Sequence, residues 1–343
     1  MNLFFDSYFQ NRLNITFTID TSPAFTSYAR EVLDTKRPVV VVDEPIKGTY
    51  QISLLNDNKT VSHNGIRLAV VGEFRSYNNE VYGQFFCRYI SIAPPGVITQ
   101  TINGSFNFDD ANLPTDTYYG KTLQAIYAVQ IQIKKLTSFA VVRELQFYVL
   151  GFDVKNPIKV SRNVIGISNL LRFEVYLPNE QVEINSALIG QIYFVYVKMK
   201  IISLKLQIIN QEYYEDEKIR IRNETVLCNF EVLDGSPARG TRVPFRIFLK
   251  SFNLSRFLNF SGSQLLSRIV AKVIVVDSDG QEYSKLLHVS FVLTEPENIE
   301  ESEKDLTEGK HILDNKREDR HETAPLISPK NEDTEEAASP CTE

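Results

Sequence analysis

The chain has 343 residues, 43% of them hydrophobic and 11% aromatic, which is enough apolar material for two cores of ordinary size. From Glu295 onward there are sixteen acidic and six basic residues. This end is therefore more negative than the whole chain, whose net charge is −6, and the rest of the chain is mildly basic. A body so close to neutral lacks the concentrated positive field that phosphate backbones require, so we expect no nucleic-acid partner.

Alternation of apolar and polar residues predicts β-strands along the first part of the chain. In the clearest row, Tyr127, Val129 and Ile131 would face a core. Gln130 and Gln132 lie between them and would face the other way, as in an antiparallel strand that is buried on one face. The strands predicted here are 49–55, 65–74, 83–92, 127–133 and 144–149.

A short polar stretch from Asp153 to Pro157 separates this block from a second strand-rich block, and we place a domain boundary there. The row Val197, Met199 and Ile201 alternates with lysines and predicts one continuous strand. The strands predicted in this block are 170–177, 190–194, 197–201, 204–208, 245–250, 268–276 and 288–293.

Turn residues between these strands favour hairpins, and Asp279-Gly280 is the sharpest such signal. Long helical periodicity is scarce. The sequence therefore predicts an all-β protein with two β-sandwich domains, 1–153 and 154–294.

After Leu293 the hydrophobicity collapses, so we expect 295–343 to form a disordered acidic tail. Within it, Leu326 and Ile327 complete a pattern similar to the acidic dileucine signals that clathrin adaptors bind. Such short patterns arise often by chance, and we expect this one to be inert.

Little in the sequence suggests chemistry. His63 is one of four histidines and lies in a turn-like context, whereas Cys228 lies in an apolar run and is expected to be a small core residue. The three cysteines have no metal-ligand spacing, and we find no phosphate loop and no nucleophile elbow. With no apolar run of about 18 residues and no signal-like start, we expect a cytosolic protein without enzyme activity, metal or cofactor.

The segment from Gly190 to Val292 resembles the second half of the vacuolar protein sorting-associated protein 26 family, the arrestin-like subunit of retromer. The strongest match is the turn around Asp234-Gly235-Ser-Pro237, which leads into the strand Val243-Pro-Phe-Arg246. Shorter segments earlier in the chain, such as Tyr118-Tyr-Gly120, are also similar, so the resemblance covers roughly 14–293.

The resemblance implies two arrestin-like sandwiches joined at a hinge, on endosomal membranes, with the second sandwich bound to the α-solenoid retromer subunit, vacuolar protein sorting-associated protein 35. Val232 and Leu233 would be apolar anchors beside a charged partner, although they could equally be core residues at a strand end. The implied solenoid-binding residues are Val232, Leu233, Asp234, Gly235, Pro237, Arg239 and Arg246.

In the family, a sorting nexin and a cargo tail meet near the hinge, where an extended peptide adds to a strand edge. The matching positions here are Ile165, Gly166 and Tyr283. Ser284 replaces an aromatic residue of the family pattern, which puts the nexin contact in doubt.

Two other classes of function remain as alternatives. The chain could be the arrestin-like subunit of retriever or an α-arrestin adaptor, but no Pro-Pro-x-Tyr motif is present. A β-sandwich hydrolase or lectin would need a clustered acid, base or metal set, and we find none in the sequence.

Overall fold

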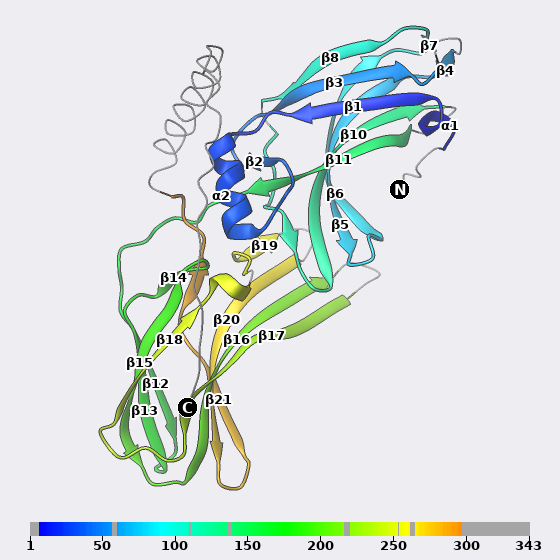
Figure 1. Ribbon diagram of the computed structural model, residues 1–343. Helices are drawn as coiled ribbons and strands as arrows, with labels where there is room; N and C mark the ends of the chain where they lie inside the picture. Colours follow the sequence, from blue (N-terminus) through cyan, green and yellow to red (C-terminus); the bar gives the residue numbers. More distant parts are fainter. Residues whose placement is uncertain are drawn as a thin grey trace, which may run out of the picture. The chain divides into compact units, whose positions relative to one another are not determined.

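The computed structural model describes residues 7–56, 60–109, 111–135, 139–215, 220–252, 254–260 and 265–296, most of them in β-strands (Figure 1). These residues also include two α-helices, α1 (Ser7–Gln10) and α2 (Pro23–Leu33), and a 3₁₀ turn (Lys250–Phe252). None of the helices described is both long and apolar enough to cross a bilayer. The prediction of an all-β fold is confirmed, and the predicted tail from 297 onward, with Leu326 and Ile327, lies outside the described residues.

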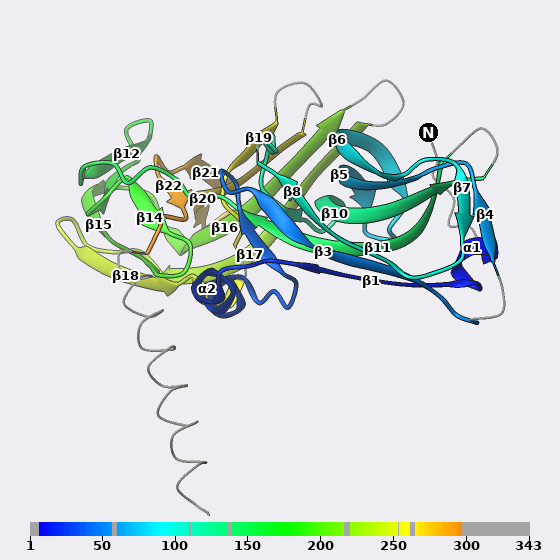
Figure 2. The same ribbon diagram turned by 90° about the horizontal axis from the view of Figure 1, so that it is seen from above.

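Two sheets enclose the core of the first half, by which we mean the residues before Asp153. A three-stranded sheet has the order β1-β3-β8, and the facing sheet has the order β2-β11-β10-β5-β6, with β9 beside β10 (Figures 1 and 2). The strands are β1 (Leu13–Ile19), β2 (Val39–Val41), β3 (Ile46–Leu54), β4 (Val61–His63), β5 (Ile66–Ser76), β6 (Val81–Ala93), β7 (Gly96–Ile98), β8 (Ile102–Phe108), β9 (Tyr118–Tyr119), β10 (Leu123–Lys134) and β11 (Phe139–Leu150).

The alternation along β10 is confirmed on its core face, because Tyr127, Val129 and Ile131 are fully buried. The opposite face differs from the expectation, since Gln130 and Gln132 are buried there too. The cause is a layer of long side chains over this face. The Arg67 guanidinium stacks between the rings of Tyr89 and Phe139 and donates to Gln132 Oε1 at 2.7 Å.

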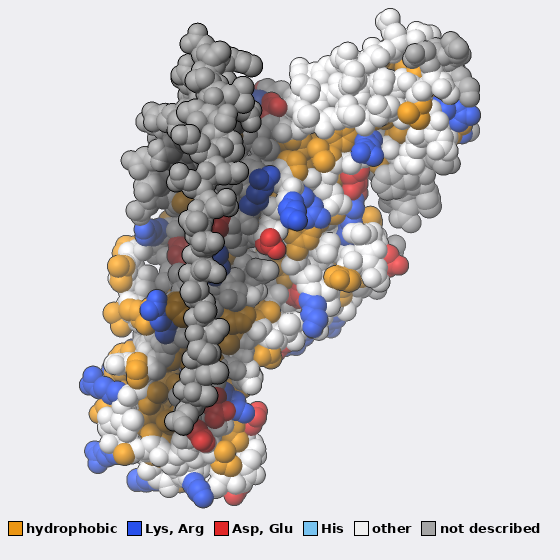
Figure 3. All heavy atoms as spheres, in the orientation of Figure 1, with side chains coloured by type: hydrophobic (Ala, Val, Ile, Leu, Met, Phe, Trp, Pro, Cys, Tyr) orange, Lys and Arg blue, Asp and Glu red, His pale blue; other side chains and the backbone are white. Residues whose placement is uncertain are grey.

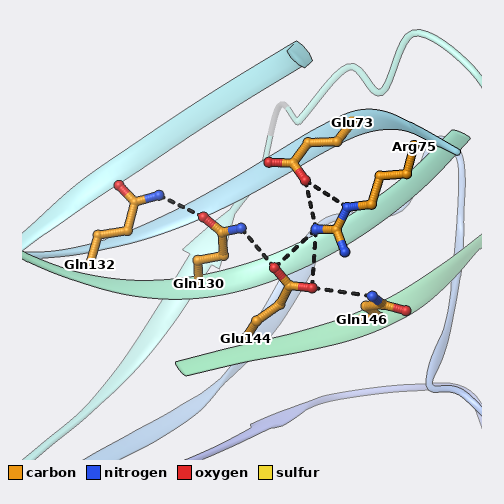
Figure 4. Close-up of polar contacts among 6 residues, drawn as sticks. All are labelled: Glu73, Arg75, Gln130, Gln132, Glu144 and Gln146. Atoms are coloured by element: carbon orange, nitrogen blue, oxygen red, sulfur yellow. Dashed lines mark hydrogen bonds and ion pairs between the residues drawn. The ribbon is translucent and has the colours of Figure 1, made fainter. Parts of the chain in front are cut away.

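This layer continues as a hydrogen-bonded network across β5, β10 and β11 (Figure 4). Gln132 donates to Gln130 at 2.7 Å, and Gln130 donates to Glu144 at 2.9 Å. Arg75 binds Glu144 and also Glu73, whose carboxylate is 2.6 Å from Arg75 Nη2. Every polar group named here has a partner, which is the condition for burying such groups at tolerable cost.

Helix α2 was not predicted. Ser22 caps its N-terminus, with Phe25 N donating to Ser22 Oγ at 3.4 Å, and Pro23 starts the first turn. Asp34 ends it in a left-handed conformation, with φ of 49°. Phe25 packs on Phe152. The Ser-Pro pair is a helix-start signal that the sequence analysis overlooked.

The second half, after Asp153, has another pair of facing sheets, around a core that also includes Ala29, Val39 and Leu150 of the first half. Their orders are β12-β13-β15-β18 and β17-β16-β20-β19, with β21 beside β20, and β14 pairs with β22 (Figure 1). The strands are β12 (Ser161–Ile167), β13 (Leu171–Leu177), β14 (Gln181–Glu183), β15 (Ala187–Val197), β16 (Ile201–Glu215), β17 (Arg220–Asp234), β18 (Arg242–Phe248), β19 (Leu258–Phe260), β20 (Leu265–Asp277), β21 (Glu282–Leu286) and β22 (Ser290–Val292).

The predicted strand 197–201 is wrong. β15 ends at Val197 and β16 begins at Ile201, because the chain crosses here from one sheet to the facing one. The alternation persists through the crossing since Val197, Met199 and Ile201 all pack against the core between the sheets. The Asp279-Gly280 hairpin is confirmed, with Gly280 at φ 78° between β20 and β21.

Polar contacts join the two halves. Arg256, from the second half, pairs with Asp116 at 2.6 Å and with Asp153 at 2.9 Å. Tyr118 donates to the buried carboxylate of Glu212 at 2.8 Å. A domain boundary near Asp153 stays a prediction, because the described residues on both sides pack as one compact unit.

Candidate functional site

The turn predicted to bind a partner connects the two sheets of the second half. β17 and β18 are edge strands of facing sheets, and residues 235–241 join them. Gly235 N donates to Ile202 O at 2.6 Å, and Gly240 N donates to Phe194 O at 2.8 Å, so each end of the turn is tied to one sheet. Both glycines have φ of 81°, a conformation that other residues rarely adopt.

The predicted solenoid-binding residues differ in exposure. Val232 and Leu233 are half-buried and pack against the core of the second half, so they are neither free anchors nor full core residues. Asp234, Arg239 and Arg246 are exposed, while Gly235 and Pro237 are half-buried. Arg246 lies on β18, on a different sheet from Val232 and Leu233.

Sequence reasoning missed the apolar side chains that are exposed on these edge strands. Phe248 on β18 is 62% exposed, and its ring centroid is 4.8 Å from the Arg246 guanidinium carbon. Val226 and Phe230 on β17 are 51% and 39% exposed. Cys228, expected in the core, is only half-buried and packs at the margin of the core, where burial raises the pKa of its thiol. Figure 3 shows apolar side chains exposed among lysines and arginines in the lower part of the view.

A groove opens at the other edge of the same sheet pair. It has a volume of about 590 Å³ and lies between the end of β12 and the β20–β21 hairpin. Ile165, Gly166 and Tyr283, predicted as a separate site, all line it, although Tyr283 is far from the other two in the sequence. Phe173 and Val275 also line it, so the groove contains apolar as well as polar surface.

Both rims of this groove are strand edges, since among the described strands β12 pairs only with β13 and β21 only with β20. Part of the β12 edge is already covered by another segment of the protein, at His288. Ser161 Oγ donates to His288 O at 2.6 Å, and His288 N donates to Asn163 Oδ1 at 2.7 Å. Gly166 lies farther along the strand and is exposed.

Ser284, which replaces an aromatic residue of the family pattern, lies beside Tyr283 on β21. Tyr283 pairs with Val275 of β20, whose side chain is in the core, so Tyr283 faces the inner side of the sheet. Its hydroxyl donates to Asp277 Oδ2 at 3.3 Å, and desolvation, with Asp277 nearby, raises its pKa. Ser284 is next in the strand, so its side chain points to the opposite face of β21, although the residue also lines the groove.

The described residues offer little for catalysis or metal binding. Among them there is no group of three or more His, Cys, Asp and Glu side chains that could hold a metal ion. His63 is buried, and its Nδ1 accepts from Gly65 N at 3.1 Å. Strand edges with exposed apolar and cationic side chains are suited to binding a protein chain.

Comparisons with known proteins show which family the sequence resembles. A family model described as vacuolar protein sorting-associated protein 26 matches residues 9–280. Proteins of that name are similar along most of their length. The one from Schizosaccharomyces pombe is 25% identical over 83% of this chain and 97% of its own. The one from Plasmodium falciparum is 25% identical over 80% and 92%, and the one from Dictyostelium discoideum is 26% identical over 74% and 73%.

Proposed function

Because this chain belongs to the vacuolar protein sorting-associated protein 26 family, we propose that it is a non-catalytic scaffold subunit of retromer. It would sort membrane cargo from endosomes to the trans-Golgi network or the plasma membrane. It would be cytoplasmic and held peripherally on endosomal membranes through the complex. Its two sandwiches, 1–153 and 154–294, would act as separate binding domains, the second of which binds the α-solenoid subunit, vacuolar protein sorting-associated protein 35.

The observation that carries this proposal is the pair of edge strands β17 and β18 with the turn between them. Phe248 and Arg246 project from β18 into solvent, stacked on each other. An exposed aromatic ring beside an arginine is the composition of interface hot spots. Asp234 and Arg239 add charges at the turn, which would fix the orientation of the partner.

The groove between β12 and β21 would hold a sorting nexin or a cargo tail. Its rims are unpaired strand edges, to which an extended peptide can add by backbone hydrogen bonds. Ile165, Gly166 and Tyr283 line this groove. The two sites lie at opposite edges of one sheet pair, so both partners could bind at the same time.

Calorimetry with the α-solenoid subunit of the same cell tests the solenoid contact. Arg246→Glu should weaken binding by about 2 kcal/mol or more, because it places a carboxylate where the partner meets a cation. Arg172→Glu is the matched control, since Arg172 is exposed on β13 of the same sheet, away from β18, and should bind like wild type. If Arg246→Glu binds as tightly as Arg172→Glu and the wild type, β18 is not part of the interface, and if both variants lose binding, the effect of Arg246→Glu is not specific to β18.

Leu233→Asp is a poor test of this contact. Leu233 packs against the core of the second half, so a buried carboxylate there would lower stability by about 1–3 kcal/mol whether or not a partner binds. Phe248→Asp is more informative because Phe248 is already mostly exposed. It should leave thermal stability unchanged and weaken binding.

A further inference from the structure

A lysine covers the β12 edge at the groove. Lys285 on β21 donates from Nζ to the carbonyl oxygen of Val164 at 2.8 Å. That carbonyl therefore points away from β13, and so does the N–H of Val164. By the alternation of an antiparallel ladder, the backbone groups of Gly166 point the same way. Lys285 thus occupies an acceptor that an added strand would use.

The open stretch of β12 begins at Val164. Before it, the side chains of Ser161 and Asn163 are hydrogen-bonded to the backbone of His288, so the segment at His288 lies beside this stretch of β12. After it, Gly166 is exposed, and a Cβ built on Gly166 would have only ordinary contact, with Leu171 O at 3.7 Å. Lys285 therefore stands at the start of the part of β12 that a peptide could reach.

The charges around the groove favour an anionic partner. Lys285 and Glu282 are its two charged lining residues. Lys285 pairs with Val273 and Tyr283 with Val275, both of them core residues, so these two side chains share the face of β21 toward the groove. Glu282 also lines the groove, but it pairs with Val276, so its side chain leaves β21 on the other face. On the face that Tyr283 and Lys285 share, the exposed charge is the Lys285 ammonium, because Asp277 is buried and accepts from the Tyr283 hydroxyl.

We propose that this groove takes an extended peptide with an acidic side chain and that Lys285 selects it, which rests on the proposed role of the groove. When a peptide N–H replaces the ammonium at Val164 O, Lys285 loses its acceptor. A glutamate or aspartate of the peptide beside that N–H gives it a new one. A glutamine displaces Lys285 without offering an equal partner.

Fluorescence anisotropy on the full chain tests this. The probes are pools of ten-residue peptides in which Leu, Val, Thr and Asn are mixed, with the fifth position fixed as Glu, Gln or Lys. The Glu pool should bind wild type about fivefold tighter than the Gln pool, the size of one partly exposed charge pair. Lys285→Met should bind the Glu and Gln pools equally and the Gln pool more tightly than wild type does. Lys285→Glu should prefer the Lys pool.

Variants of Gly166 establish where the pools bind. Gly166→Pro removes an N–H that points away from β13, so no hydrogen bond between β12 and β13 is lost, and proline is tolerated at such edge positions. This variant should abolish peptide binding. Gly166→Ala keeps the N–H and should bind as wild type. Thermal melting checks that both variants fold.

The outcomes separate the two proposals. If Glu and Gln pools bind wild type equally, and this binding is lost in Gly166→Pro, the groove binds peptides but Lys285 does not select them. If no pool binds, or if Gly166→Pro binds normally, the groove does not bind peptides and both proposals are wrong. Calorimetry with the α-solenoid subunit should be unchanged in all these variants, since β17 and β18 are at the other edge.

Discussion

At the scale of residues, the polar side chains behave least as their pattern predicts. Gln130 and Gln132 alternate with core residues, yet they are buried because a second layer of hydrogen bonds covers them. Alternation identifies the face of the sheet on which a side chain lies, but not whether that face is exposed to solvent. Partners such as Glu144 come from a strand that only the folded topology places beside them.

Arg75 is the residue on which this layer most depends. Its guanidinium is nearly buried between the carboxylates of Glu73 and Glu144. Arg75→Met would leave both carboxylates without a cation, and we expect a loss of about 3–5 kcal/mol in the free energy of unfolding. Urea unfolding measures it. Lys159→Met is the matched control. Lys159 also pairs with a carboxylate, Glu180, but the two side chains are 72% and 24% exposed, so its loss should cost less than about 1 kcal/mol. Equal losses in the two variants would contradict this account.

His63 should make stability depend on pH. Burial lowers its pKa from the ordinary value of 6.5, and its Nδ1 accepts a hydrogen bond that protonation would break. Near pH 6.5 the unfolded chain binds a proton at His63 that the folded chain does not bind. The contribution of His63 to the free energy of unfolding is therefore present above pH 6.5 and is lost as the pH falls below it. Urea unfolding at pH 7.5 and 5.5 should show a larger drop for wild type than for His63→Asn, which cannot titrate. Identical drops would mean that His63 is protonated in the fold.

At the scale of elements, strands were easier to predict than their ends and connections. Most strands were found because half-buried ladders impose a period of two on the sequence. The crossing at 198–200 was missed because Met199 packs on the core between two exposed lysines, which continues the alternation of the strands on either side. Helix α2 was missed because its signal lies in the Ser22-Pro23 start and not in the periodicity of its residues. The groove could be predicted as a set of residues only through a family resemblance, since Ile165 and Tyr283 meet by topology.

The cap of α2 gives a test at this scale. Ser22→Ala removes the acceptor of Phe25 N and should lower stability by about 1 kcal/mol. Ser27→Ala, inside the same helix on an exposed position, should be neutral or slightly stabilising. Thermal unfolding followed by circular dichroism compares the two. A cap variant as stable as the Ser27 variant would show that tertiary packing alone fixes the helix end.

At the scale of the whole molecule, the second half offers two strand edges to partners on opposite sides of one core. β17 and β18 form the edge on one side, and β12 and β21 form the edge on the other. Exposed edges are a liability in a free protein because they promote aggregation, and they are usually covered or charged. Here Lys285 and the segment at His288 cover one, while Arg246 and Phe248 stand at the other. Such edges suit a subunit that functions within an assembly.

Hydrogen–deuterium exchange of the full chain, with and without the α-solenoid retromer subunit, tests this account most directly. We predict that the solenoid subunit slows exchange in 226–248, over β17, the turn and β18, and leaves the β12 edge unchanged. Tight binding with protection confined to other strands would contradict the interface, and a folded chain that does not bind the solenoid subunit would contradict the proposed scaffold function.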